Sequence, residues 1–437
     1  MRKVKRDFAK KVMTALLLSA IGIPMSGQNL ERMIDDVEPK VIEWRRDFHR
    51  NPELSNREFE TSKKVAAFLE ELGMEVRKGV AHTGVVGVLK GGKPGPVVAL
   101  RADMDGLPVT ERVDLEFASK VKSEYNGIET GVMHACGHDT HMAMLMGAAE
   151  VLTALKKDLR GTVKFIFQPA EEGVPPGEDG GAWMMVREGA LKDPDAEVIF
   201  GLHINAQTDV GKITYKPGGT MAAAQRFVIK VKGKQTHGSR PWGGVDPIVI
   251  SAQIINGLQS LISRDTELTN EAAVVSVGLI RGGVRNNIIP EEVEMIGTIR
   301  TLDYDMQKKL NEMMKFRVMS IAESYGGKAE IEIQNGIPIT YNDPELTARM
   351  VPTLERFAGK ENVILKNAVT GAEDFAFYQK EIPGFFFFVG GKPIDVRVED
   401  SASHHTPDFF IDESGMKLGV SSLVNLTLDY MGVEIKM

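Results

Sequence analysis

The stretch GVMHACGHDTHMAM gathers the only cysteine of the chain, Cys136, and three of its nine histidines, His134, His138 and His141. Thiolate and imidazole are ligands that zinc prefers, and imidazole also suits manganese together with carboxylates. Residues two apart point to opposite faces of a strand and lie well apart on a helix, so Cys136 and His138 can share a metal site only from a loop. Gly137 between them makes such a loop accessible.

Carboxylates and a further histidine follow segments that are typical of β-strands. Asp103 and Asp105 follow PVVAL, Glu171 and Glu172 follow TVKFIFQ, and His203 follows AEVIFGL. In open α/β sheets ligands bind beyond the carboxyl ends of the strands, so we expect these side chains at one edge of a sheet. Taken alone, paired glutamates are usually solvated and a single histidine after a strand is usually structural. Their joint placement at successive strand ends favours a metal site.

The helix after the cysteine is expected to begin near Asp139, which we interpret as its N-cap. A helix N-terminus lowers the pKa of a nearby thiol, so we expect Cys136 to be the thiolate that binds metal. His141 lies inside this helix and His134 precedes the cysteine. We interpret both as supporting or structural residues rather than ligands.

Three other loops carry residues of chemical interest. The turn-like segment SASHHTPDFF contains His404 and His405, of which one is interpreted as a ligand and its neighbour as a support. His237 lies in the glycine-rich segment GKQTHGSRPWGGVDP, and Asn286 and Asn287 lie in RGGVRNNIIPEE. Taken from the residues alone, the last two segments indicate loop chemistry only.

These residues need a sheet to position them. Apolar spacing is helical from about Asn29 to Leu72, and short β-branched runs then alternate with helical stretches. Such alternation is typical of a mainly parallel sheet covered on both faces. Farther along, the order becomes β-α-β-β-α-β, which is ferredoxin-like and fits a compact second domain. The sequence predicts an α/β fold with a larger domain, residues 28–221 and 335–437, and an inserted α+β domain, residues 222–334.

The N-terminus has the layout of a secretory signal peptide. A basic segment is followed by an apolar run from Val12 to Ile23 and then by small residues. The run is apolar all round rather than on one face, and it is too short to span a bilayer comfortably. We predict that residues 1–27 direct export to the periplasm or the exterior, with no membrane association once they are removed.

Composition limits the class of partner. The net charge is -7, and basic residues cluster only at the extreme N-terminus, which argues against nucleic acid and favours small molecules as partners. A single cysteine forms no intrachain disulfide, so in an exported protein Cys136 is a free thiol unless a metal holds it.

Several motifs together resemble the M20 metallopeptidase family. They are RADMDGLP, MHACGHDTHMAMLMGAA, FQPAEEG, GLHI, HGSRPWGGVDPI, NNIIP, GAEDFAFY and HHTPDFF. More narrowly, the chain is similar to the amidohydrolase branch, which includes hippurate hydrolases, plant auxin-conjugate hydrolases and N-acetyldiaminopimelate deacetylases. The resemblance runs from about Leu30 to Val433 and includes the metallopeptidase fold of the larger domain.

The resemblance implies two divalent metal ions, zinc or manganese, and a ligand set for them. The implied ligands are Cys136, His138, Glu172, His203 and His405. Glu171 is implied as the general acid/base, which takes a proton from the attacking water and gives one to the leaving amine. The resemblance alone assigns the two glutamates, because spacing does not distinguish them. Asp105 is implied to orient the metal site.

The resemblance also assigns a role to the inserted domain. It implies that this domain mediates dimerisation, so a homodimer is expected. His237 is implied to reach the active site of the partner subunit and to stabilise the developing oxyanion, with Asn287 nearby. The active site would then need two chains or a domain closure.

The expected reaction is hydrolysis of the amide bond of an N-acyl-amino acid, such as a hippurate-like substrate, to a carboxylic acid and an amino acid. A dipeptidase on the same site is the nearest alternative and would need a group that binds a free α-amine. A non-catalytic binding protein that keeps the fold is a third interpretation, but it would be expected to lack ligands or Glu171, and all are present.

Two features leave specificity open. The region after the inserted domain reads IQNGIPITY and offers no arginine for a substrate carboxylate, so carboxylate recognition is unassigned. QPAEEGVPPGEDGGAWMM is longer before its glycines than the resemblance leads us to expect, which predicts a reshaped pocket rim.

Overall fold

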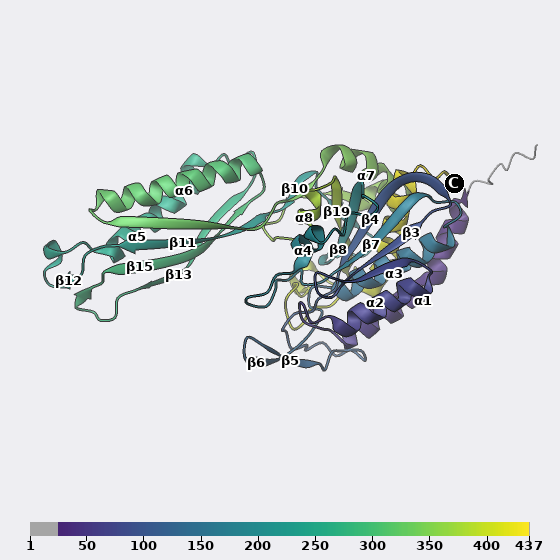
Figure 1. Cartoon of the computed structure of the whole chain (residues 1–437), viewed down its shortest axis with the longest axis horizontal. Helices are drawn as coiled ribbons and strands as arrows, with labels where there is room; N and C mark the ends of the chain where they lie inside the picture. The colour runs from purple at the N-terminus through teal and green to yellow at the C-terminus, as the bar shows by residue number, and fades with distance from the viewer. Residues whose placement is uncertain (1–24, 437) are drawn as a thin grey trace, which may run out of the picture.

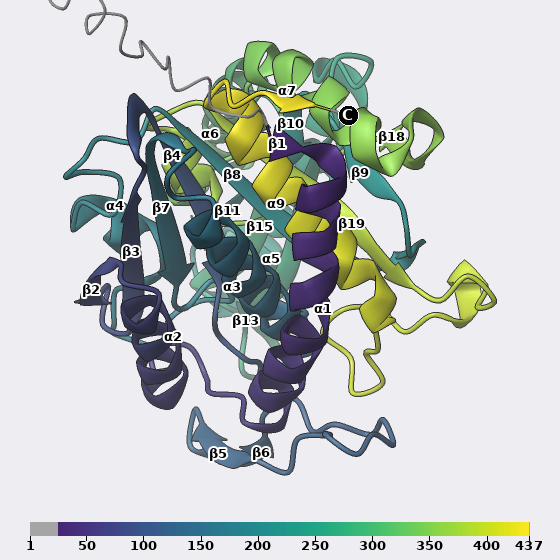
Figure 2. The same cartoon turned by 90° about the vertical axis from the view of Figure 1, so that its right-hand side faces the viewer.

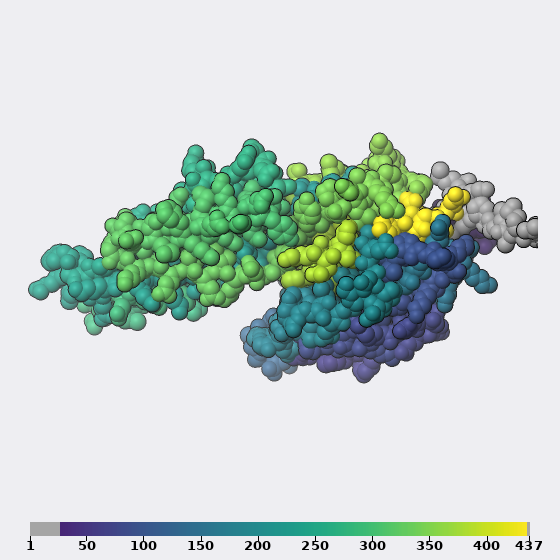
Figure 3. Space-filling view, turned by 45° about the horizontal axis from the view of Figure 1, so that its top comes forward, coloured from purple at the N-terminus to yellow at the C-terminus, as the bar shows by residue number. Residues whose placement is uncertain are grey.

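The computed structural model describes residues 25–436, so most of the predicted signal segment, residues 1–24, lies outside the described residues. The described chain forms two lobes, each with its own sheet (Figure 1). The space-filling view in Figure 3 shows the smaller lobe extending from the larger one. Within residues 25–436, no helix is long and apolar enough to cross a membrane.

The larger lobe is built on an eight-stranded sheet of order β18-β9-β19-β8-β4-β7-β3-β2. The central strands β19, β8, β4 and β7 are mutually parallel, while β2 and β3 add antiparallel pairs at one edge. The strands are β2 (Glu75–Val80), β3 (Gly84–Lys90), β4 (Lys93–Asp103), β7 (Arg160–Gln168), β8 (Val198–Asp209), β9 (Ile213–Tyr215), β18 (Val363–Leu365) and β19 (Gly384–Lys392). The prediction of a mainly parallel sheet is confirmed.

Helices cover both faces of this sheet. One face packs against α1 (Gly27–Arg50), α2 (Phe59–Glu71), α3 (His138–Ala154), α7 (Pro344–Ala358) and α9 (Met416–Tyr430). Figure 2 shows α1, α3 and α9 side by side. The other face packs against α4 (Gly181–Arg187) and α8 (Ala376–Gln379). Burial on both faces explains why the central strands read as continuous apolar runs such as FFFF in β19.

The smaller lobe has the predicted β-α-β-β-α-β order. Its elements are β11 (Ala223–Lys232), α5 (Pro247–Ser260), β13 (Ala273–Gly282), β15 (Glu292–Thr301), α6 (Tyr304–Ser324) and β16 (Lys328–Ile337). The antiparallel sheet of order β13-β15-β11-β16 is ferredoxin-like, and it shares one apolar core with α5 and α6. β11 begins one residue after the predicted boundary at 222, and β16 runs to Ile337, three residues past the boundary at 334.

Short elements complete the chain and shape the loops near the strand ends. They are β1 (Met25–Ser26), β5 (Lys122–Tyr125), β6 (Ile128–Gly131), β10 (Gly218–Met221), β12 (Thr236–His237), β14 (Ile288–Ile289), β17 (Thr340–Asn342) and β20 (Ile435–Lys436). β5 and β6 form a hairpin, and β12 pairs with β14 inside the smaller lobe.

Candidate active site

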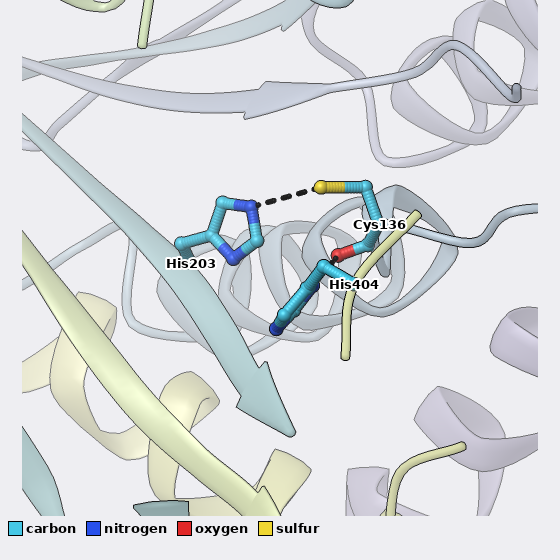
Figure 4. A group of neighbouring side chains, drawn as sticks. All are labelled: Cys136, His203 and His404. Atoms are coloured by element: carbon cyan, nitrogen blue, oxygen red, sulfur yellow. Dashed lines mark hydrogen bonds between the residues drawn. The ribbon is translucent and has the colours of Figure 1, made fainter. Parts of the chain in front are cut away.

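Four of the five predicted metal ligands meet through close contacts at the carboxyl end of the central strands. The Sγ atom of Cys136 lies 3.3 Å from Nε2 of His203, which β8 presents (Figure 4), and 3.2 Å from Nε2 of His405. The same nitrogen of His405 lies 3.0 Å from Oε1 of Glu172. Thiol, imidazole and carboxylate thus converge from four segments far apart in the sequence.

The fifth predicted ligand, His138, directs a free nitrogen toward the glutamates. Its Nε2 atom lies 3.9 Å from Oε2 of Glu171 and from Oε1 of Glu172. Nε2 of His138 is buried without a hydrogen-bond partner among the described residues. Buried polar atoms normally have a partner, and an unpartnered imidazole nitrogen that faces two carboxylates fits a divalent cation between them.

The second nitrogen of each imidazole fixes its orientation. Nδ1–H of His138 donates to the backbone oxygen of Asp105 at 2.9 Å, and Nδ1–H of His203 donates to the backbone oxygen of Ile204 at 2.5 Å. In the neutral imidazole these bonds leave Nε2 as the lone-pair nitrogen, as a metal ligand requires. The residues present therefore fit divalent metal ions.

Gly137 makes the loop between the cysteine and the histidine possible. Its φ angle is +97°, and a Cβ atom there would meet Cγ2 of Ile204 at 2.3 Å. Only glycine combines that backbone conformation with so close an approach. Ala170 and His405 also have positive φ angles, +53° and +63°, so the backbone is strained beside both the glutamate pair and the C-terminal ligand.

Two predictions about this loop are wrong. The helix begins at His138 with Gly137 as its N-cap, so Asp139 lies in the first turn instead of capping it. The Asp139 side chain instead forms ion pairs with Arg45 and His49, each at 2.8 Å, and caps no backbone N–H of the helix. The pKa of the Cys136 thiol is also raised, not lowered, because burial and the carboxylates of Glu172 and Glu171 disfavour the thiolate. A thiolate in this site needs a cation.

His404 is a neighbour of the ligands with both ring nitrogens already used. Its Nδ1–H donates to the backbone oxygen of Cys136 at 3.1 Å, as Figure 4 shows, and its Nε2 accepts from the backbone N–H of Ala206 at 3.1 Å. Nε2 of His405 faces Cys136 and Glu172 instead. Both histidines lie in groups that could hold a metal ion, and this geometry fits a ligand role for His405 and a supporting role for His404.

The two other histidines of the opening stretch differ from each other. Nδ1–H of His141 donates to Asp103 at 2.6 Å and its Nε2 accepts from the backbone N–H of Ile204, so it braces β8 and has no free nitrogen. His134 is buried without a hydrogen bond to any described residue, and burial lowers its pKa to about 4. It is therefore a neutral packed side chain that orients no ligand directly.

Asp105 contacts both His138 and the adjacent glutamates. Its carboxylate accepts from Nδ1–H of His138 at 3.2 Å, from the backbone N–H groups of Glu171 and Glu172 at 3.1 and 3.0 Å, and from the hydroxyl of Ser55 at 2.7 Å. One fully buried carboxylate thus contacts the predicted ligand His138 and the backbone of both glutamates, a position that fits the implied role of orienting the metal site.

The two adjacent glutamates face different surroundings. Glu172 meets His405, whereas Glu171 lies beside Glu373 and Asp374 and accepts from the backbone N–H of Asp374 at 3.4 Å. Burial, Glu373 and Glu172 raise the pKa of Glu171 well above its ordinary range. A raised pKa is what a carboxyl group needs to act as a general acid near neutrality.

No site role was predicted for Glu373, Asp374 or Arg101. The fully buried Arg101 guanidinium lies 3.0 Å from Glu373, 2.9 Å from Asp374 and 2.6 Å from Asp103. This cation partly balances the carboxylates behind Glu171. Arg101 lies in the motif RADMDGLP, and Glu373 and Asp374 lie in GAEDFAFY. The pairing of Arg101 with Asp374 joins residues 273 positions apart, so no pattern in the local sequence predicts it.

The two predicted site residues of the inserted domain, His237 and Asn287, lie away from the ligand group. His237 is exposed on β12, at the end of the smaller lobe farthest from β4 and β8 (Figure 1). Asn287 is also exposed there, and its backbone oxygen accepts from Gly238 beside the histidine. The structure brings His237 and Asn287 close to each other but not to Cys136 of the same chain.

A cavity of about 600 Å³ opens beside the ligand group. Its lining includes Cys136, Glu171, Glu172, His203, His405, Glu373, Asn205, Thr370 and Phe388 of the larger lobe, and Ala224, Val274, Arg300 and Ile337 of the smaller one. Arg300 lies near the end of β15, opposite Ala224 of β11 and Val274 of β13. It forms no ion pair with any residue in 25–436, so its charge is free for a ligand.

The comparisons with known proteins agree with this geometry and confirm the resemblance. The model of peptidase family M20/M25/M40 matches residues 99–429. Thermostable carboxypeptidase 2 of Saccharolobus solfataricus is 40% identical over 92% of this chain and 98% of that protein. N-acetylcysteine deacetylase of Bacillus subtilis is 38% identical over 89% of this chain and 96% of that protein.

A solved structure of a dinuclear metal-binding peptidase of the M20 family, also from Bacillus subtilis, is similar throughout. Its TM-score is 0.76 at 34% identity, and the match covers 92% of this chain and all of that one. The chain therefore belongs to peptidase family M20/M25/M40 and is a metal-dependent hydrolase of amide or peptide bonds.

Proposed function

We propose that this protein hydrolyses N-acyl-amino acids to a carboxylic acid and a free amino acid. The observation that carries the proposal is the cavity in which Arg300 faces the same space as Glu171 and the cysteine-centred ligands. A substrate of this class has an amide for the ligand group and an anionic carboxylate for the guanidinium. The lining of this one cavity therefore offers a partner for each of these two groups.

Each side chain has a distinct task in this reaction. Two divalent ions, zinc or manganese, would be held by Cys136, His138, Glu172, His203 and His405. When bound, the ions would supply an activated water and polarise the amide carbonyl. Glu171 accepts the proton of the water and delivers a proton to the amide nitrogen, which leaves as the amine. Asp105 keeps Glu171 and Glu172 in position through their backbone N–H groups.

The names of the relatives support this class of substrate. One relative is named for deacetylating N-acetylcysteine, an N-acyl-amino acid, and the other is named a carboxypeptidase. Both names describe cleavage of an amide whose amine half carries a free carboxylate. An unpaired arginine in the cavity suits that common feature.

The proposal extends to assembly and location. A homodimer would bring the exposed His237 and Asn287 of one subunit to the cavity of the other, where an N–H donor stabilises the oxyanion of the attacked carbonyl. Export is proposed from the basic and apolar layout of residues 1–27.

The test is a product assay with metal-loaded protein. The enzyme is incubated with a mixed panel of N-acyl-amino acids and dipeptides, and released products are identified by mass spectrometry, with Glu171→Gln as the control. We expect release from the acylated substrates and none in the control. Cleavage of dipeptides alone would replace the proposal with a peptidase, and no cleavage would favour a binding protein.

A further inference from the structure

We propose that Glu58 positions the general acid/base Glu171 by holding the backbone at Ala170, one residue before it. The inference rests on the proposed function, because it deepens the role given there to Glu171. Oε1 of Glu58 accepts from the backbone N–H of Ala170 at 2.9 Å, and its Oε2 accepts from the hydroxyl of Thr83 at 2.6 Å. Glu58, Ala170 and Thr83 are all buried.

Three consecutive backbone N–H groups after β7 donate to buried carboxyl groups. The N–H of Ala170 donates to Glu58. The N–H groups of the next two residues, Glu171 and Glu172, donate to Asp105 at 3.1 and 3.0 Å. Asp105 thus holds the two glutamates relative to each other, whereas Glu58 holds the residue through which the chain enters the pair.

The backbone conformation of Ala170 makes it dependent on this contact. Its φ angle is +53°, in the left-handed region that residues other than glycine rarely adopt. Such a conformation persists only where surrounding contacts hold it. The direction of the Glu171 side chain follows from the backbone just before it. Loss of the hydrogen bond from Ala170 would therefore let Glu171 turn away from the ligand group.

The segment NPELSNRE uses its two glutamates for different tasks. Glu58 occupies the N-cap position of α2, but its side chain caps no N–H of that helix. Glu53 bonds the first turn instead, since its carboxylate accepts from the backbone N–H groups of Glu60 and Thr61 at 3.1 and 2.8 Å. The carboxyl group of Glu58 is therefore directed to the loop of Ala170 and not to its own helix.

The task of Glu58 is geometric. Burial and the carboxylate of Asp105 raise its pKa to about 8. A carboxyl group keeps an oxygen that can accept the N–H of Ala170 in either protonation state. Glutamine has the same length and an amide oxygen as acceptor, so it can replace glutamate in this contact. Alanine cannot.

The test compares kcat, KM and metal content of Glu58→Ala, Glu58→Gln and Glu53→Ala on a substrate that the wild type hydrolyses. Glu53→Ala is the matched control, because it removes from the same segment a carboxylate that accepts backbone N–H groups of α2. We expect Glu58→Ala to lower kcat roughly 10- to 100-fold, with KM within about threefold and metal content unchanged. Glu58→Gln should keep kcat within about threefold of the wild type. Glu53→Ala should lower the midpoint of urea unfolding but leave kcat within about twofold.

Two further variants separate positioning from folding. Thr83→Val keeps the shape of the side chain but removes the hydroxyl that holds Oε2 of Glu58, so we expect kcat to fall by about 3- to 10-fold. If Glu58 acts through Glu171, the two losses are not additive. Glu58→Ala should then lower kcat far less in the Glu171→Gln background than in the wild type.

The outcomes distinguish this inference from the proposed function. Unchanged kcat in Glu58→Ala and Thr83→Val, equal losses in Glu58→Ala and Glu58→Gln, loss of metal in Glu58→Ala, or additive losses with Glu171→Gln would overturn the inference with the proposed function intact. A wild type active on dipeptides alone would overturn only the proposed function, because Glu171 has the same task in peptide hydrolysis and the variants are then compared on a dipeptide. A wild type inactive on both classes would overturn the two together.

Discussion

At the scale of single residues, the site depends on which atoms are already bonded. His138, His203 and His404 each donate one ring N–H to a backbone oxygen, but only His404 also accepts a backbone N–H at its second nitrogen. Nε2 of His203 instead faces Sγ of Cys136, and Nε2 of His138 faces the carboxylates of Glu171 and Glu172. Ligand and support are thus distinguished by hydrogen bonding, a property that residue type alone does not contain.

Arg300 carries the prediction about substrate recognition. Arg300→Ala removes a cation that no described residue neutralises, so the substrate carboxylate loses its charged partner. We expect kcat/KM for an N-acyl-amino acid to fall by roughly 10- to 100-fold, the worth of a hydrogen bond to a charged group. The corresponding N-acyl-amino amide is the control and should be hydrolysed equally by both proteins. A parallel loss on the neutral amide would assign Arg300 a structural role.

At the scale of elements, strand ends and one helix start set the site geometry. β8 brings His203 and β7 leads into Glu171 and Glu172, while the loop before α3 brings Cys136. Because these strands are adjacent and parallel around β4, their carboxyl ends meet at one edge of the sheet.

Gly137 provides a test at this scale. Gly137→Ala forces a side chain against Ile204 and onto a left-handed backbone, so we expect the free energy of unfolding to fall by about 1–3 kcal/mol and metal content to fall with it. Gly127→Ala is the control, because its φ angle is +78° but no atom lies within 4 Å of the added Cβ. Urea unfolding and elemental analysis measure both effects. Equal behaviour of the two variants would show that the close approach has no role.

His49 links α1 to α3 and gives a pH-dependent contribution. Burial lowers its pKa, but the carboxylates of Asp139 and Glu111 outweigh burial and raise it above the ordinary value of 6.5. A raised histidine pKa stabilises the fold fully below the unfolded value, and this contribution is lost as pH rises through the folded value. We expect His49→Gln to cost about 2 kcal/mol at pH 6 and less at pH 9 by urea unfolding. A cost independent of pH would contradict the charged histidine.

Alternation of strands and helices predicted both sheets, and the resemblance predicted which ligands to look for. The N-cap at Asp139 and a lowered thiol pKa were predicted from local rules, and both were wrong because distant groups decide them. Arg45 and His49 pair with Asp139, while burial and the carboxylates of Glu172 and Glu171 raise the pKa of the Cys136 thiol. Glu373 and Asp374 were not predicted as site residues for the same reason, because their partner Arg101 lies on β4, far away in the sequence.

At the scale of the whole molecule, the two lobes divide the work. The larger lobe supplies the ligand group, while the smaller lobe supplies Arg300 at its near end and His237 at its far end (Figure 1). Movement of one lobe relative to the other would therefore alter the distance between Arg300 and the ligands. His237 lies too far along the smaller lobe to approach the ligand group of its own subunit.

Mixing two inactive variants tests whether His237 acts in a partner subunit. In a hybrid dimer of Glu171→Gln and His237→Ala, one site combines an intact Glu171 with an intact His237. Random mixing should restore roughly a quarter of wild-type activity, since half the dimers are hybrids with one working site each. Each variant alone, assayed at the same concentration, provides the baseline. A mixture no more active than that baseline would contradict assembly of the site from two chains.

The central claim is that one of the adjacent glutamates acts on protons while the other holds metal. The decisive measurement is metal content, by elemental analysis, together with product release for Glu171→Gln and Glu172→Gln side by side. We expect Glu171→Gln to retain metal and to lose turnover by about 100- to 10,000-fold, and Glu172→Gln to lose metal. Metal loss with residual activity in Glu171→Gln, and full metal content in Glu172→Gln, would contradict the account.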